Sequence, residues 1–177
     1  MLLISQQYRH PAKRDIRRAL SLIEVVASTM IVGLMAVAAL NSLGAATRSS
    51  DSIGNRAVAL ALADELMSEI LQALYEDPTQ TPVIGRESGE AASPRSQFDD
   101  VDDYENWNQN PPQFRDGTII PYRTLWRHRV RVRLVTPGNP TLISVTDQGV
   151  KRIDISIEHD GKVLATQSAI RTNTDKK

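Results

Sequence analysis

The chain has 177 residues, of which 41% are apolar and 24% are charged, and it contains no cysteine. This length fits one membrane segment and one modest folded domain, and the composition argues against wholesale disorder. Without cysteine, a disulfide framework and cysteine-ligated zinc are excluded. The formal net charge is zero, but residues 1–19 have five basic residues against one acidic residue, and residues 20–177 have 16 against 20. The acidic remainder, at −4, argues against nucleic acid as a partner.

A long stretch near the N-terminus has no charged residue, from Val25 to Thr47. As a helix, these 23 residues would extend about 35 Å, which is enough to cross a hydrocarbon core of roughly 30 Å. The basic residues of the leader lie on its N-terminal side. The positive-inside rule therefore predicts a cytoplasmic N-terminus, with everything after Thr47 on the other side of the membrane.

Glu24 lies at the edge of this apolar stretch. A carboxylate in the first turn of a helix interacts favourably with the helix dipole. A charged side chain within lipid nevertheless costs about 2.5 kcal/mol or more, and such a residue is usually functional. We therefore expect Glu24 to have a cationic partner.

The residues before and at this position form a basic, small, then apolar-to-acidic pattern: Arg17, Arg18 and Ala19, followed by Leu20, Ser21, Leu22, Ile23 and Glu24. The pattern resembles the N-terminal signature of type IV prepilins. This resemblance implies that prepilin peptidase cuts after Ala19, that the new amine of Leu20 is methylated, and that Glu24 pairs with the amine of a neighbouring subunit. The family most often has Gly and Phe where this chain has Ala19 and Leu20, which predicts slower cleavage.

The resemblance also implies a function and a location. We expect a minor pilin or pseudopilin, anchored in the inner membrane with its C-terminal domain in the periplasm, and assembled into a type IV pilus or a type II secretion pseudopilus. The implied partners are prepilin peptidase, other pilin or pseudopilin subunits, the inner-membrane assembly platform and the lipid bilayer. The alternative is a single-pass, membrane-anchored periplasmic binding or sensor protein.

A second helical pattern follows the apolar stretch and is expected to end near Glu76, because Pro78 would interrupt a helix. The polar run that ends at Gly54 predicts a bend or soft turn between the two helical segments. The predicted buried face consists of apolar residues at three- and four-residue spacings: Ile53, Ala57, Leu60, Met67, Leu71 and Leu74.

Residues 77–117 are rich in Pro, Gly, Ser, Asn and Asp and are expected to form a long irregular connection. Four of its carboxylates lie close together, at Asp99, Asp100, Asp102 and Asp103. Two interpretations remain open. The four carboxylates bind calcium, although their spacing differs from that of an EF-hand loop, or they form a solvated acidic loop held by the neighbouring apolar and aromatic residues Phe98, Val101, Tyr104 and Trp107. The segment also resembles one in minor pilins of the mannose-sensitive haemagglutinin pilus.

Two period-2 patterns predict strands in the C-terminal third. In the first, Trp126, His128, Val130, Val132 and Leu134 alternate with four arginines. In the second, Ile153, Ile155 and Ile157 alternate with polar residues, and Asp160-Gly161 then predicts a hairpin. We expect an α+β fold, in which three or four antiparallel strands cover one face of the helix. The predicted organisation is a leader at 1–19, a transmembrane helix at 20–47, an amphipathic helix at 48–76, an acidic loop region at 77–117 and a sheet at 118–177.

The arginines of the first strand pattern form a basic face. We expect them to pair with Asp154 and Glu158 of the neighbouring strand, rather than to bind DNA. The three histidines are isolated, and the sequence has no GxSxG, GxGxxG or P-loop motif. The chain is therefore not expected to be an enzyme or to have a cofactor, apart from the calcium of the first interpretation above.

Overall fold

The computed structural model describes residues 21–77, 84–87 and 90–174. The chain divides into two compact units, residues 1–47 and 48–177. One long helix, α1 (Leu22–Gln72), has residues in both units. It continues without interruption through the polar run that ends at Gly54, so the predicted soft turn is not present there.

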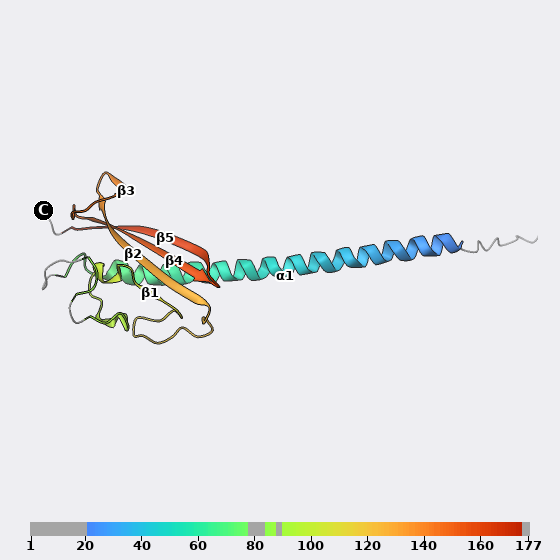
Figure 1. Cartoon of the computed structure of the whole chain (residues 1–177), viewed down its shortest axis with the longest axis horizontal. Coiled ribbons are helices and arrows are strands. Elements are labelled where there is room, and N and C mark those ends of the chain that lie inside the picture. Colours follow the sequence, from blue (N-terminus) through green and yellow to red (C-terminus); the bar gives the residue numbers. More distant parts are fainter. Residues whose placement is uncertain (1–20, 78–83, 88–89, 175–177) are drawn as a thin grey trace, which may run out of the picture. The chain divides into compact units, whose positions relative to one another are not determined.

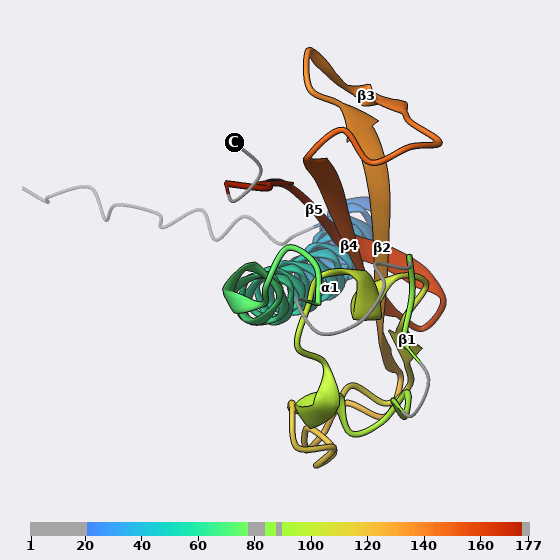
Figure 2. The ribbon, with the colours of Figure 1, turned by 90° about the vertical axis from the view of Figure 1, so that its left-hand side faces the viewer.

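The second unit contains five antiparallel strands (Figure 1). The strands β1, β2, β4 and β5 lie in that order, and β3 pairs with the end of β2. The predicted α+β fold is confirmed, with five strands instead of the expected three or four. Figure 2 looks along the helix and shows the sheet beside it. The bounds are β1 (Asn108–Gln109), β2 (Trp126–Thr136), β3 (Asn139–Ile143), β4 (Val150–His159) and β5 (Lys162–Thr172).

The alternation of β2 and β4 is confirmed. Trp126, His128, Val130 and Val132 are buried on one face of β2, and the three isoleucines of β4 are buried beside them. The pattern changes at the end of β2, where Val135 is buried and Leu134 is only half-buried, next to an irregularity in the pairing with β3. The predicted hairpin is also confirmed, because Asp160 and Gly161 both have positive φ, at 49° and 73°, as a tight two-residue turn requires.

The helix buries a different face from the predicted one. The buried residues of α1 are Ala59, Leu62, Ala63, Leu66, Met67 and Ile70. Of the predicted face only Met67 is among them, and Leu60 is 53% exposed. The reason is that residues 57–63 are all apolar, so a helical period fits this segment in more than one phase. The choice of face was made by the sheet and the loop that cover the helix.

The helix also ends earlier than expected, at Gln72 instead of near Glu76. After it, Leu74 pairs with the acidic segment: its N–H donates to the Asp99 carbonyl over 3.0 Å, and its carbonyl accepts from the Val101 N–H over 3.0 Å. Tyr75 is then buried. These long-range hydrogen bonds take the backbone groups that another helical turn would have used.

Candidate functional site

The N-terminal half of α1 has the features that a membrane span needs. Within α1, an 18-residue window has a mean hydropathy of 2.2 and no buried residue. The large apolar side chains from Leu22 to Leu43 are 45% to 84% exposed. Since burying apolar side chains is the main favourable contribution to folding, such a surface is stable only when lipid or another protein covers it. The helix is long enough and apolar enough to cross a membrane.

Glu24 is the acidic residue in the first turn of this helix. Its backbone N–H donates to the Ser21 carbonyl over 2.9 Å, which closes the first turn. Its side chain is exposed, and within the described part of the chain no cation pairs with it. The predicted cleavage and methylation residues, Ala19 and Leu20, lie outside the described residues. Glu24 is therefore a carboxylate at one end of an exposed apolar helix.

Residues 98–107, here called the acidic segment, are largely buried, which corrects the expectation of a solvated loop. Asp100, Asp102 and Asp103 are at most 2% exposed, and Asp99 alone is exposed. The apolar residues of this segment behave as predicted: Phe98, Val101, Tyr104 and Trp107 all join the core between sheet and helix. Their burial draws the carboxylates between them into the domain, and all three residues of the short helix η2 (Asp102–Tyr104) are buried.

The four predicted carboxylates do not share one partner. Asp100 Oδ1 accepts the N–H groups of Asp102 and Asp103, at 2.6 and 3.2 Å, and its Oδ2 accepts the Asp77 N–H at 2.7 Å. Asp102 Oδ2 lies 2.7 Å from Lys151 Nζ. Asp103 Oδ2 accepts the Asp99 N–H at 2.9 Å. Three of the four carboxylates therefore take part in structural hydrogen bonds or an ion pair.

Lys151 connects the acidic segment to the sheet and to the chain after the helix. Its side chain is 2% exposed, it donates to the Tyr75 carbonyl and to Asp102, and its Nζ lies 3.9 Å from the centre of the Tyr75 ring. Tyr75 Oη in turn donates to Asp147 over 2.6 Å. Despite the lysine, burial raises the pKa of Asp102 to about 6. The sequence did carry a signal for Lys151, since it stands two residues before Ile153, on the covered face of a period-2 strand.

Another ion pair fixes the loop against the helix. Arg95 is buried and holds Glu69 of α1 with two hydrogen bonds of 2.9 Å, in the bidentate geometry that guanidinium and carboxylate prefer. Tyr104 Oη donates to the same carboxylate over 2.9 Å, and the guanidinium lies 4.5 Å from the centre of the Trp107 ring. The side chain of Glu69 is 14% exposed and lies beside the buried residues of α1.

Asp103 belongs to a different group of carboxylates. Its Oδ1 is buried and has no hydrogen-bond partner, and the same is true of both carboxylate oxygens of Glu87. Glu87, Glu90 and Asp103 each place an oxygen within 4.8 Å of the others. Burial, followed by the contact with Glu90, raises the pKa of Asp103 to about 8. Nothing in the sequence singled out Glu87 and Glu90, which are two of several acids in a polar loop.

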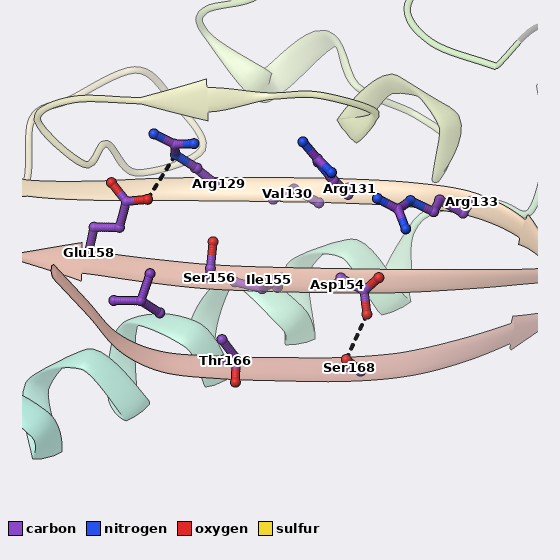
Figure 3. A pocket seen from close by; sticks show the side chains of 11 residues that line it. Arg129, Val130, Arg131, Arg133, Asp154, Ile155, Ser156, Glu158, Thr166 and Ser168 are labelled. Atoms are coloured by element: carbon purple, nitrogen blue, oxygen red, sulfur yellow. Dashed lines mark hydrogen bonds and ion pairs between the residues drawn. The ribbon is translucent and has the colours of Figure 1, made fainter. Parts of the chain in front are cut away.

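The basic face of β2 lines a hollow of about 490 Å³ on the side of the sheet opposite the helix (Figure 3). Arg129 pairs with Glu158 at 3.0 Å, which confirms one predicted cross-strand partner. Asp154 instead pairs with Arg152 of its own strand, at 2.9 Å, and accepts a hydrogen bond from Ser168. Arg131, opposite Asp154 in the pairing of β2 and β4, makes no ion pair within the described part of the chain. The face is thus partly neutralised.

His128 gives this domain a pH-dependent stability. The ring is buried beside Trp107, and both of its nitrogens lack a hydrogen-bond partner. Burial, together with the nearby Arg95 charge and against the opposing charge of Glu69, lowers the pKa of His128 to about 4. In the unfolded chain the histidine takes up a proton at about pH 6.5. Between about pH 4 and pH 6.5, the unfolded state therefore binds more protons than the folded state.

We expect His128→Phe to reduce the loss of stability between pH 6.5 and pH 4. The contribution of the neutral histidine is complete above pH 6.5 and falls as the pH decreases toward 4, by at most about 3 kcal/mol. The measurement is the urea midpoint of the full chain in detergent at several pH values, by tryptophan fluorescence. An unchanged difference between pH 7 and pH 4.5 in the variant would show that other groups cause the acid sensitivity.

The described arrangement, a long apolar N-terminal helix whose C-terminal part packs on an antiparallel sheet, is a pilin-like architecture. Comparisons with protein-family models, with curated proteins and with solved structures find no match to this chain. The chain is thus pilin-like in its architecture: it combines an α+β domain with a helix long and apolar enough to cross a membrane.

Proposed function

We propose that this chain is a minor pilin or pseudopilin, which is processed by prepilin peptidase and assembled through its N-terminal helix into a type IV pilus or a type II secretion pseudopilus. The observation that carries the proposal is the combination of an exposed apolar helix with a single carboxylate, Glu24, in its first turn. A plain membrane anchor has no use for that carboxylate, because it costs free energy in lipid. A filament of parallel subunits supplies it with a cation, the N-terminal amine of a neighbour.

The remainder of the chain fits this role. The apolar part of α1 includes small residues, such as Ala27, Gly33 and Ala36, which allow close approach between helices. Apolar residues of α1 beyond residue 48 are also exposed, among them Ile53 at 68% and Leu60 at 53%. These side chains give the helix of the second unit exposed apolar residues of its own. In the filament, neighbouring helices cover this surface, and the sheet domain makes the lateral contacts on the outside.

The proposed topology places the N-terminus in the cytoplasm and the sheet domain in the periplasm. The partners are then prepilin peptidase, other pilin or pseudopilin subunits and the inner-membrane assembly platform, and the chain itself catalyses no reaction. A single-pass binding or sensor protein would share the topology, but it would keep its leader. The two functions therefore differ in the N-terminus of the mature protein.

The mass of the chain isolated from membranes distinguishes them. We expect a chain that begins at a methylated Leu20, and we expect Gly in place of Ala19 to give the same mature N-terminus with faster processing. Intact-mass spectrometry of the purified protein, with N-terminal peptide sequencing, makes the measurement. An intact N-terminus at Met1 in cells with active prepilin peptidase would contradict the proposed function.

A further inference from the structure

Three carboxylates meet at the edge of the acidic segment, away from the helix that carries the proposed assembly function. Asp103 lies on η2 and is fully buried, while Glu87 and Glu90 come from the loop before it. One oxygen from each carboxylate lies within 4.8 Å of the other two. Three carboxylates converge here from two separate segments of the chain.

The oxygens of this group lack the partners that buried carboxylates normally have. Asp103 Oδ1 and both oxygens of Glu87 are buried without a hydrogen-bond donor. Buried polar atoms without a partner are rare in native proteins, and each one costs free energy. The backbone has already fixed the other oxygen of Asp103, which accepts N–H groups at 2.9 and 3.3 Å. Its free oxygen is thereby held toward the two glutamates.

Three basic side chains that contact residues 95–103 have other partners. Arg95 pairs with Glu69, Lys151 pairs with Asp102, and Arg115 donates to the Phe98 carbonyl over 3.0 Å. The acidic segment adds further negative charge instead, at the buried carboxylates of Asp100 and Asp102. Carboxylates this close cannot all remain charged without a counterion. A proton or a cation must neutralise them.

The donor set indicates which cation fits. All the ligand atoms are carboxylate oxygens, and hard cations prefer oxygen, whereas zinc and copper sites use His or Cys. Calcium binds six to eight oxygens at about 2.3–2.6 Å, and water can supply the ligands that the three carboxylates do not. Calcium also accepts irregular geometry and bidentate carboxylates, whereas magnesium needs a near-ideal octahedron at about 2.1 Å.

We propose that Glu87, Glu90 and Asp103 form a calcium-binding site, in which the ion joins Glu87 and Glu90 to the buried acidic segment. The ion replaces the missing hydrogen-bond partners and neutralises the repulsion between the three carboxylates. Calcium binding thereby stabilises the second unit, and extracellular calcium modules generally bind the ion with dissociation constants of about 10⁻⁴–10⁻³ M. This site differs from the four-aspartate set suggested by the sequence and includes only Asp103 from it.

The test is a calcium titration of the full chain in detergent, by isothermal calorimetry and by thermal unfolding, after treatment with chelator. We expect saturable binding of calcium in the micromolar to millimolar range and a rise of a few degrees in the unfolding midpoint. Magnesium at the same concentration should give a much smaller shift. The absence of both heat and thermal shift with 5 mM calcium would overturn the proposal, as would an equal response to magnesium.

Variants locate the site. We expect Glu87→Gln with Glu90→Gln to weaken calcium binding by at least tenfold, because both lie in a loop and the exchange keeps their size. Asp99→Asn is the matched control: it removes one negative charge from the exposed neighbour of the same segment and should leave the affinity within about twofold. An equal loss in both variants would show general attraction to an acidic surface. The wild-type titration remains decisive if the double variant does not fold.

Discussion

Replacing Glu24 by alanine is expected to reduce incorporation of this chain into filaments by at least tenfold, while its amount in the membrane stays the same. The carboxylate lies in the first turn of a helix whose large apolar side chains are exposed. Its removal makes the helix more apolar and hence no less suited to the bilayer. It also removes the proposed partner of the Leu20 amine, so that the amine of the next subunit would enter the apolar filament core unpaired.

The measurement compares the sheared filament fraction with the membrane fraction by immunoblot, in cells that express the assembly system. Glu65→Ala is the matched control, because Glu65 is an exposed glutamate on the same helix, far from its first turn. We expect this control to assemble normally. Glu24→Asp should keep part of the incorporation, since it keeps the charge on a shorter side chain. Normal assembly of Glu24→Ala would refute the proposed pairing.

Lys151→Met is expected to destabilise the sheet domain by about 3–5 kcal/mol, the usual cost when one partner of a buried ion pair is removed. The Lys151 side chain is 2% exposed, and its ammonium group donates hydrogen bonds to both Asp102 and the Tyr75 carbonyl. Methionine has a similar length but no charge and no donor. Asp102 would then be left buried with neither oxygen satisfied, because its Oδ1 already lacks a partner.

Denaturant unfolding of the full chain in detergent, monitored by tryptophan fluorescence, measures this effect. Arg152→Met is the matched control, because it removes the neighbouring cation and its ion pair with Asp154. In that pair the Arg152 side chain is 19% exposed and the Asp154 side chain is 31% exposed. Such a partly exposed pair should contribute no more than about 1 kcal/mol. Adding Asp102→Asn to Lys151→Met should recover part of the loss. If Lys151→Met and Arg152→Met destabilise the domain equally, the burial of the Lys151 ion pair does not explain the contribution of Lys151 to stability.

Several features of this protein follow from the sequence alone because they depend on local patterns. The absence of charge from Val25 to Thr47 is enough to predict a helix able to span a membrane. The alternation in β2 and β4 predicts which residues face the core, since side chains of a strand alternate between two faces. Asp160-Gly161 predicts its hairpin through the positive φ that these residues tolerate.

Other features were decided only by the tertiary structure. Because residues 57–63 are uniformly apolar, the helical period left open which face would be buried, and the covering sheet selected the one that includes Leu62 and Leu66. The four aspartates of the acidic segment looked equivalent in the sequence. Their different environments arise because Val101 between them and the aromatic residues on either side enter the core, and because Lys151, Glu87 and Glu90 approach from elsewhere in the chain. Burial and long-range contact, which determine how a carboxylate behaves, are properties of the folded chain and have no local signature.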